Sequence, residues 1–267
     1  MFAGAAFGGN PVAVVHDADN LSTAQMQRFA RWTNLAETTF LLAPTAAEAD
    51  YRLRIFTPGG ELPFAGHPTL GSCRAWLDTK RPSVSSAQVV QECGIGNIPI
   101  KVAADQIAFA APPLSRTGAV DPAALAAITD ALGLDAADVV DAAWLDNGIP
   151  WIGILTGSAA TVLHLQPDFA ALGEYCVGVI GPHPAGGPAD FEVRAFYPGA
   201  PEDPVTGSLN AGLAVWLVNA GVFPSEYVAA QGTALGYTGR IRVSRDGVGA
   251  LWIGGMTHAR IRGEVSF

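Results

Sequence analysis

Short apolar runs recur along the chain between Gly and Pro residues, and few segments show the spacing of an amphipathic helix. The pattern predicts strands at Pro11–Val15, Thr39–Leu42, Tyr51–Phe56, Ile98–Val102, Trp151–Leu155, Phe191–Phe196, Arg240–Val243 and Ala250–Ile253. It predicts helices at Ser22–Thr33, Pro68–Leu77, Pro122–Leu132 and Leu209–Val218. A Ser cap opens the first helix, and an Asp-Pro pair opens the third. Many strands with few helices favour an α+β fold over a doubly wound parallel sheet.

The stretch APPLSRTGAVDP, Ala111 to Pro122, is the predicted linker between two domains. Its prolines and small polar residues are poorly suited to pack as a strand or a helix. We therefore expect an N-terminal half over residues 1–113 and a C-terminal half over residues 120–267. The last strand is a candidate to return to the N-terminal half.

The two halves contain similar stretches, IFTPGGELPFAGHPTLGSCRAWL (Ile55–Leu77) and AFYPGAPEDPVTGSLNAGLAVWL (Ala195–Leu217). Both run from a strand through a Pro-Gly turn and a Glu-bearing loop to a Gly-polar pair and an apolar helix that contains Trp-Leu. This similarity indicates an internal repeat. A duplicated pair of domains commonly places its binding site where equivalent loops face each other.

Composition and charge narrow the class of partner. The chain of 267 residues is 49% hydrophobic and carries a net charge of −9, without any run of Lys or Arg. A negative protein repels nucleic acid and anionic membrane surfaces, so we expect neither as a partner and expect a small molecule instead. The sequence predicts no membrane-spanning segment and no signal peptide.

The three cysteines and five histidines show no spacing typical of metal ligands. His67 in particular has no companion at ligand spacing, so we expect no metal ion at the site, and no feature calls for a cofactor. Cys73, Cys93 and Cys176 are far apart in sequence and are interpreted as reduced thiols of a cytoplasmic protein. We expect Cys73 to be a core residue.

Two predicted helix starts carry the candidate chemistry. A helix N-terminus exposes unpaired N–H groups and a partial positive charge, so it attracts a carboxylate or a developing oxyanion. Gly66 and Gly207 would let a ligand approach the backbone. Nearby stand His67, Asp203 and Ser208, with Glu37 just before a strand. Taken singly, these are also typical of surface histidines and of turn or helix caps. As a set, they indicate an acid/base site around a small anionic substrate.

The chain resembles the PhzF-like proteins of phenazine biosynthesis, within the diaminopimelate-epimerase-like superfamily. The matching stretches are GGNPVAVV (Gly8–Val15), NLAETTFLL (Asn34–Leu42), IFTPGGELPFAGHPTLGS (Ile55–Ser72), PEDPVTGSLNAGLAVWL (Pro201–Leu217) and the QG and GR pairs at 231–232 and 239–240. The resemblance implies two pseudo-equivalent domains, each a mostly antiparallel β-sheet wrapped around a central α-helix, with the site in the cleft between them. It also implies a homodimer.

In the isomerase that names the family, a glutamate moves a proton between two carbons of a cyclic acid, helped by a histidine, an aspartate and a serine. By motif, the resemblance assigns these catalytic roles to Glu37, His67, Asp203 and Ser208. The expected substrate-binding residues are Gly66, Gly207, Thr206 and Asn10. Epimerases of the superfamily carry a cysteine at each helix start. In this chain, the positions of those two cysteines are occupied by His67 or its neighbours and by Ser208. This argues against a two-thiol mechanism.

The leading hypothesis is a cofactor-independent isomerase that shifts a proton or epimerises a carbon in a small carboxylated substrate, with Glu37 as general acid and base. A neutral His67 would orient the substrate or relay a proton, because the helix dipole disfavours a charged imidazole. One alternative is a serine hydrolase using Ser208, His67 and Asp203, although GSLNAG does not match the G-x-S-x-G elbow. The other alternative is a non-catalytic binding protein of the same fold.

Overall fold

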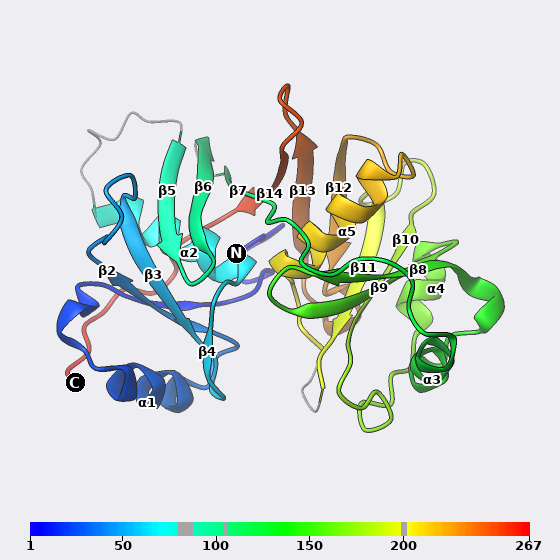
Figure 1. The fold of residues 1–267 in the computed structure, drawn as a ribbon, viewed down its shortest axis with the longest axis horizontal. Helices are drawn as coiled ribbons and strands as arrows, with labels where there is room; N and C mark the ends of the chain where they lie inside the picture. Colours follow the sequence, from blue (N-terminus) through cyan, green and yellow to red (C-terminus); the bar gives the residue numbers. More distant parts are fainter. Residues whose placement is uncertain (80–87, 104–105, 199–201) are drawn as a thin grey trace. The chain divides into compact units, whose positions relative to one another are not determined.

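The computed structural model of the chain describes residues 1–79, 88–103, 106–198 and 202–267. The chain divides into two compact units (Figure 1). Unit 1 consists of Met1–Ala3, Pro11–Ala110 and Gly254–Phe267, and unit 2 consists of Gly4–Asn10 and Ala111–Ile253. A short N-terminal segment that includes Asn10 therefore belongs to the unit formed mainly by the second half of the chain.

Unit 1 contains a sheet with strand order β1-β2-β3-β5-β6-β7, and β4 pairs with β3. The β1–β2 and β3–β5 pairs are parallel, and the other pairs are antiparallel. Its elements are β1 (Ala13–Val15), η1 (Ala18–Asn20), α1 (Thr23–Thr33), β2 (Thr38–Leu42), β3 (Tyr51–Phe56), β4 (Glu61–Leu62), α2 (Gly66–Thr79), β5 (Gln88–Cys93), β6 (Gly96–Ala103) and β7 (Gln106–Ala110).

Unit 2 contains strands in the order β8-β9-β10-β11-β12-β13-β14. The last strand ends in residues assigned to unit 1. The elements are α3 (Pro122–Leu132), η2 (Ala136–Asp138), β8 (Val139–Asp146), β9 (Pro150–Thr156), α4 (Ala159–His164), β10 (Cys176–Pro182), β11 (Phe191–Phe196), α5 (Gly207–Asn219), β12 (Glu226–Gln231), η3 (Thr233–Leu235), β13 (Gly239–Arg245) and β14 (Leu251–Met256).

The two units repeat one pattern of strand pairing. Along β9-β10-β11-β12-β13 the pairs are parallel, antiparallel, parallel and antiparallel, as they are along β1-β2-β3-β5-β6. In each unit a buried helix connects the third and fourth of these strands, α2 in unit 1 and α5 in unit 2. The carboxylates of Asp50 and Asp190 also accept equivalent bonds, from the N–H of Val90 on β5 and of Val228 on β12. The predicted α+β fold of two pseudo-equivalent domains is confirmed.

Helix α5 is buried on almost every side, and small residues on the sheet allow its close approach. Gly153 on β9 and Gly178 on β10 are paired neighbours. A Cβ at Gly178 would overlap the side chain of Leu209 on α5, and a Cβ at Gly153 would lie 3.2 Å from Leu213 of the same helix. The two glycines therefore let the leucines of α5 pack directly on the strand backbones.

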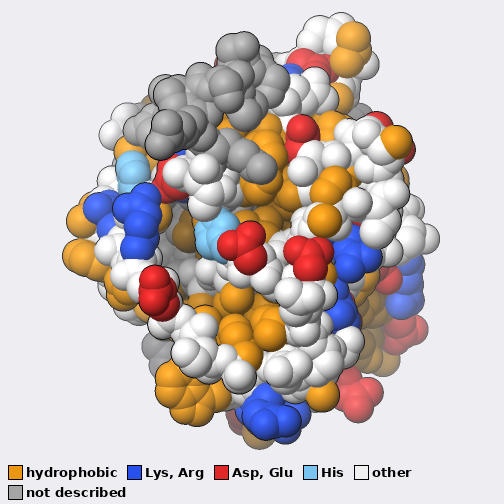
Figure 2. Space-filling view, turned by 90° about the vertical axis from the view of Figure 1, so that its left-hand side faces the viewer, with side chains coloured by type: hydrophobic (Ala, Val, Ile, Leu, Met, Phe, Trp, Pro, Cys, Tyr) orange, Lys and Arg blue, Asp and Glu red, His pale blue; other side chains and the backbone are white. Residues whose placement is uncertain are grey.

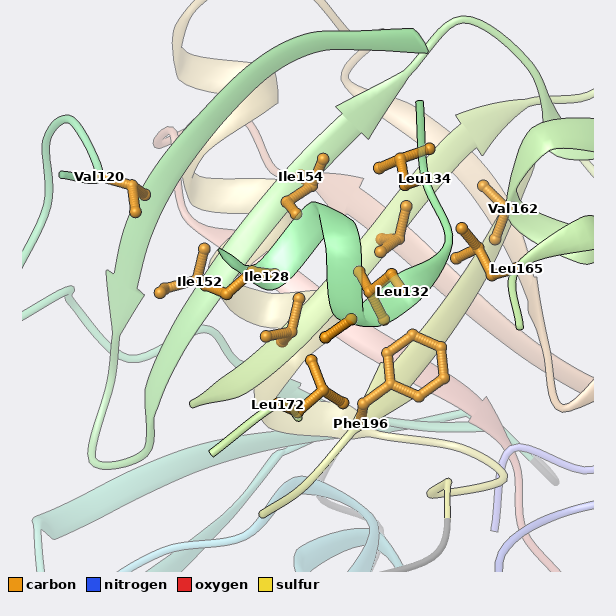
Figure 3. Packing of buried hydrophobic residues seen from close by; sticks show 13 residues of the cluster. Val120, Ile128, Leu132, Leu134, Ile152, Ile154, Val162, Leu165, Leu172 and Phe196 are labelled. Atoms are coloured by element: carbon orange, nitrogen blue, oxygen red, sulfur yellow. The ribbon is translucent and has the colours of Figure 1, made fainter. Parts of the chain in front are cut away.

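The opposite face of these strands packs on α3 and α4 (Figure 3). Val177 and Val179 flank Gly178 along β10 and belong to this second core, because successive residues of a strand point to opposite faces. Figure 3 shows Ile128 and Leu132 of α3 beside Ile152 and Ile154 of β9. Unit 2 is thus a sheet covered by helices on both faces.

In unit 1, α1 begins where the sequence predicts. Ser22 caps the helix by accepting a bond from the N–H of Gln25, and the Gln25 side chain accepts one from the N–H of Ser22. The helix buries Met26 and Ala30 in a small core with Phe40 of β2. Helix α2 contacts β1, β2, β3, β5 and β7.

The predicted helices are all present, and two begin earlier than expected, α2 at Gly66 and α5 at Gly207. Strand β1 starts two residues later than predicted, at Ala13. The sequence reading missed β4, β5, β7, β8, β10 and β12, and helix α4. Several of the missed strands, such as CVGVIGP and EYVAAQ, contain Gly, Pro, Ala or Gln, which have weak strand propensity. Their burial against the helices outweighs that propensity.

On the face in Figure 2, Lys and Arg side chains lie in separate groups among acidic side chains and form no continuous basic patch within the described part of that face. No helix among the described residues is long and apolar enough to cross a membrane. The same residues contain no cluster of three or more His, Cys, Asp or Glu side chains suited to hold a metal ion. The described face thus lacks the basic stripe with which proteins follow a phosphate backbone.

The packing of α5 on Gly178 leads to a stability prediction. Replacing Gly178 by Ala forces a methyl group into the Leu209 side chain and should lower the free energy of unfolding by about 1–3 kcal/mol. Gly157→Ala is the matched control, because a Cβ there meets nothing within 4 Å. Urea unfolding of the three proteins checks this. Equal stability of the two variants would show that α5 does not pack this closely on β10.

Candidate active site

Glu37 is held between the end of α1 and the start of β2. Asn34, the C-cap residue of α1, adopts a left-handed conformation with φ of 51° and turns the chain away from the helix axis. Three residues later, Glu37 directly precedes the fully buried strand that begins at Thr38. The side chain of Glu37 is 12% exposed, so its carboxylate is largely removed from water.

His67 is the second residue of α2 and faces Glu37. Its side chain is 4% exposed, and its Nε2 lies 3.1 Å from Oε2 of Glu37. Both atoms are buried, and neither has a hydrogen-bond partner among the described residues. The carboxylate oxygen is therefore close to the ring nitrogen but poorly aligned with it for a hydrogen bond. Two buried, unsatisfied polar atoms face each other at the start of a helix, which is uncommon in folded proteins.

Hydrogen bonds along α2 fix the position of His67. Ser72 Oγ lies 2.8 Å from Thr39 Oγ1 on β2, the strand that follows Glu37. Thr69 Oγ1 accepts a bond of 3.0 Å from the side chain of Gln91 on β5. These contacts tie α2 to two strands of its sheet, so His67 and Glu37 belong to one rigid part of unit 1.

The first turn of α2 also supplies hydrogen-bond donors. The N–H groups of Gly66 and His67 have no carbonyl partner within the helix, and Pro68 has no N–H group. They lie at the positive end of the helix dipole, which favours an anion. The pair of acid and imidazole thus stands beside a site suited to a negative charge.

In unit 2, Asp203 precedes α5 and is bound by two of the four residues expected to bind substrate. Its Oδ1 accepts a bond of 2.7 Å from Asn10 Nδ2, and its Oδ2 accepts one of 2.6 Å from Thr206 Oγ1. Asn10 also donates to the carbonyl of Val205 at 2.9 Å. The sequence prediction therefore names three residues, Asn10, Asp203 and Thr206, that the structure places in one hydrogen-bonded group.

Gln231 on β12 holds this group against α5. Its Oε1 accepts bonds from the N–H of Thr206 and from the side chain of Asn210, at 3.0 and 2.9 Å. Its Nε2 donates to the hydroxyl of Thr206 and to the carbonyl of Asp203, at 2.8 and 3.1 Å. Gln231 and Asn210 are fully buried, so a buried polar network fixes the start of α5.

Ser208 is the second residue of α5, the position that His67 holds in α2. Its Oγ accepts a bond of 3.1 Å from the indole N–H of Trp151, and its carbonyl accepts one of 2.8 Å from Asn147. Sequence reasoning missed both partners, because they lie 57 and 61 residues away along the chain.

The structure thus brings together Glu37 and His67 in unit 1, and Asn10, Asp203, Thr206 and Ser208 around the start of α5 in unit 2. Gly66 and Gly207 are the first residues of the two helices. Residues 199–201, part of the repeated stretch, lie outside the described residues. That the two groups act on one substrate stays a prediction.

Known proteins resemble the chain over nearly its whole length. The family model described as phenazine biosynthesis-like protein, PhzC-PhzF, matches residues 1–261. A protein of Schizosaccharomyces pombe named antisense-enhancing sequence 1 is 36% identical over 99% of this chain and 96% of its own length. The trans-2,3-dihydro-3-hydroxyanthranilate isomerase of Pseudomonas aeruginosa is 34% identical over 93% of this chain and 89% of its own length.

Solved structures agree with these matches. The crystal structure of a phenazine biosynthesis protein of the PhzF family from Enterococcus faecalis has a TM-score of 0.75 and 26% identity, over 96% of this chain and 92% of that protein. Several curated relatives are named isomerases. The family suggested by the GHPTLGS and EDPVTGS motifs is therefore confirmed. The chain belongs to the phenazine biosynthesis-like PhzC-PhzF family, an enzyme family in which several of its relatives are named isomerases.

Proposed function

We propose that this isomerase moves a proton between carbon atoms of a small carboxylated substrate, with Glu37 as the general acid and base. The observation that carries the proposal is the buried approach of Glu37 Oε2 to His67 Nε2 at the start of α2, in which neither atom has a hydrogen-bond partner among the described residues. Atoms left unsatisfied in a fixed structure are available to a substrate. A carboxylate placed against a C–H bond can take its proton and return it elsewhere.

The reaction balances without an oxidant or reductant. Glu37 takes a proton from one carbon, the electron pair of the broken C–H bond shifts through the adjacent unsaturated system, and the same proton or one from water returns to a carbon. Negative charge develops on the substrate between the two steps. The N–H groups of Gly66 and His67 lie at the positive end of α2 and would stabilise that charge.

His67 would assist through its imidazole. In the neutral form, one ring nitrogen donates a hydrogen bond and the other accepts one, so the ring can orient the substrate or pass a proton to it. His67 lies between Gly66 and Pro68. Proline has no N–H group, but the first turn of a helix does not need one there, so Pro68 fixes the backbone next to His67 without loss of a helical hydrogen bond.

We further propose that the start of α5 binds the same substrate. Support comes from the internal repeat, which gives Ser208 the place in α5 that His67 has in α2. The first turn of α5 offers N–H groups for an anionic group, and Asn10 and Thr206 hold the Asp203 carboxylate beside it. Asp203 would then orient a donor group of the substrate. The named activity of the relative, on a dihydroanthranilate, fits a substrate with a carboxylate and an amine.

A thiol mechanism has no support at Cys73 or Cys176. Cys73 is fully buried in α2, and burial raises the pKa of its thiol to about 12. Burial also raises the pKa of the Cys176 thiol, to about 11. A thiol of such a pKa is almost wholly protonated near neutral pH, whereas proton abstraction requires the thiolate. The expectation that Cys73 is a core residue agrees with this burial.

The serine hydrolase alternative also lacks support. A nucleophilic serine needs a neighbouring base to take its proton, and Ser208 Oγ instead accepts a bond from Trp151. His67, the base of that alternative, has its Nε2 3.1 Å from Glu37 Oε2. The relatives named as isomerases favour proton transfer over hydrolysis.

Two expectations accompany the proposed function. We propose a cytoplasmic location, supported by three cysteines that form no disulfide. We also propose a homodimer, supported by the resemblance to the PhzF-like family. Light scattering during size-exclusion chromatography would report the oligomeric state directly.

Glu37→Gln tests the proposed base. The amide keeps the shape of the side chain and loses the ability to accept a proton. We expect the incorporation of solvent deuterium into trans-2,3-dihydro-3-hydroxyanthranilate and a panel of small carboxylates to fall by about 10²- to 10⁴-fold. Mass spectrometry of the recovered substrates measures it.

Glu48→Gln is the matched control, because Glu48 is an exposed glutamate of the same unit. It should exchange deuterium at the rate of the unaltered protein. A Glu37→Gln variant that also keeps that rate would contradict the assignment of Glu37 as the base.

Alkylation tests whether cysteine thiols take part in the proton transfer. At neutral pH, a thiol with a pKa of about 12 is ionised in roughly one molecule in a hundred thousand. Iodoacetamide should therefore leave Cys73 unmodified in the folded protein and modify it once guanidinium unfolds the chain. Cys93, which is only partly buried, serves as the internal comparison. Rapid labelling of Cys73 in the folded protein, accompanied by loss of deuterium exchange, would instead support thiol chemistry.

A further inference from the structure

An arginine on the third strand of unit 1 pairs with a glutamate that precedes the buried helix. Arg54 is the fourth residue of β3, and Glu61 lies five residues before Gly66, where α2 begins. Arg54 donates from Nε to Glu61 Oε1 at 2.7 Å and from Nη2 to Oε2 at 2.6 Å. This two-pronged geometry fixes the carboxylate in direction as well as in distance.

The same pair recurs in unit 2. Arg194 is the fourth residue of β11, and Glu202 lies five residues before Gly207, where α5 begins. Arg194 donates from Nε to Glu202 Oε1 at 3.0 Å and from Nη2 to Oε2 at 2.7 Å. Each guanidinium also lies 5.1 Å from the ring of the phenylalanine two residues further along its strand, Phe56 and Phe196. The internal repeat thus includes one complete set of side-chain contacts.

The two pairs differ in burial. The side chains of Arg54 and Glu61 are 23% and 39% exposed, whereas those of Arg194 and Glu202 are 7% and 3% exposed. Arg194 also donates from Nη1 to the carbonyl of Leu165, at the end of α4, at 2.8 Å. Water screens the pair in unit 1, so that pair constrains its loop weakly. The pair in unit 2 is enclosed and held from two sides.

Stability alone explains the buried pair poorly. Removing two charges from water is costly, and well-packed apolar residues often stabilise a core as well or better. A paired arginine and glutamate do provide a fixed direction, which apolar side chains lack. The pair is therefore better suited to holding the chain from Glu202 to the start of α5 in one conformation.

The loop held in this way carries Asp203. Glu202 is bound by Arg194, and the N–H of the next residue, Asp203, donates to the carbonyl of Ala195 on β11 at 3.0 Å. The carboxylate of Asp203 then meets Asn10 and Thr206. The side-chain pair and the backbone bond together clamp this part of the loop to β11. Displacement of Glu202 would move Asp203 directly, because the two are adjacent.

We propose that Arg194 and Glu202 are positioning residues that hold Asp203 and the first turn of α5 in the arrangement needed for catalysis. The inference rests on the proposed function of Asp203. The equivalent pair, Arg54 and Glu61, holds the loop before α2 in the same way but contributes less, because it is exposed.

The test replaces both charges at once, with Arg194→Met and Glu202→Leu. This double variant leaves no unpaired buried charge, so it should fold with a melting temperature close to that of the unaltered protein. The matched control is Arg54→Met with Glu61→Leu. Hydrogen exchange, followed by NMR, reports on the amides of Asp203 and Thr206, which are bonded to Ala195 and Gln231. The amide of Ile154 on β9 reports on the rest of unit 2.

We expect the amides of Asp203 and Thr206 to exchange at least about tenfold faster in the unit 2 double variant, with Ile154 unchanged. The unit 1 control should leave all three unchanged. For any substrate that incorporates deuterium, kcat should fall by about tenfold or more and KM should change little, because a misplaced group affects the reaction more than binding. Arg194→Lys keeps the positive charge but loses the two parallel N–H donors that bind the Glu202 carboxylate. It should show the same changes in smaller degree.

Unchanged exchange at Asp203 and Thr206 in a folded double variant would overturn the proposal. Equal acceleration at Ile154 would also overturn it, since that result indicates a stability role alone. If the double variant does not fold, Arg194→Lys decides by the same criteria. Asp203→Asn separates the two proposals. Full activity of that variant would refute the proposed role of Asp203 in the reaction. The hydrogen-exchange results would then still decide whether Arg194 and Glu202 hold Asp203 in place.

Discussion

The first N–H groups of α2 and α5 have no carbonyl partner within their helix, and in both helices these first residues are buried away from water. Polar side chains lie at both starts: Glu37 and His67 at that of α2, and Asp203, Thr206 and Ser208 at that of α5. Thr206, the N-cap residue of α5, makes no side-chain bond to these N–H groups. They are therefore the donors that we propose for an anionic group of the substrate.

The two helix starts are prepared differently. In unit 2, Gln231 is bonded to Asn210, Thr206 and the carbonyl of Asp203, and these bonds fix Asp203. In unit 1, Glu37 and His67 approach to 3.1 Å without a satisfied hydrogen bond. A hydrogen-bonded network is suited to binding and orientation, whereas an acid and an imidazole without hydrogen-bond partners are suited to proton transfer. This difference supports the two roles that we propose for the two helix starts.

Much of this arrangement could be predicted from the sequence. The spans of β3, β11 and α3 match their predictions in full, because each has a strong pattern or clear end signals. The sequence predicts the starts of α2 and α5 two residues too late along the chain. Gly66 and Gly207 are poor helix formers, and tertiary contacts hold them in the first turn. Strand β10 is missed because glycine has low strand propensity, and the packing of Leu209 on Gly178 is visible only in the folded chain. Trp151 and Asn147, which contact Ser208, could not be found from local patterns, because only the folded chain brings them there.

The most direct test of the account is a crystal structure of the Glu37→Gln variant with bound trans-2,3-dihydro-3-hydroxyanthranilate or another carboxylate that incorporates deuterium in the unaltered protein. The account predicts that a reacting carbon lies about 3–3.5 Å from the side chain at position 37, within reach for proton transfer. It also predicts that the substrate carboxylate accepts hydrogen bonds from N–H groups at the start of α2 or α5. A ligand bound with its reacting carbons away from position 37 and from both helix starts would contradict the assignment of Glu37 as the proton carrier.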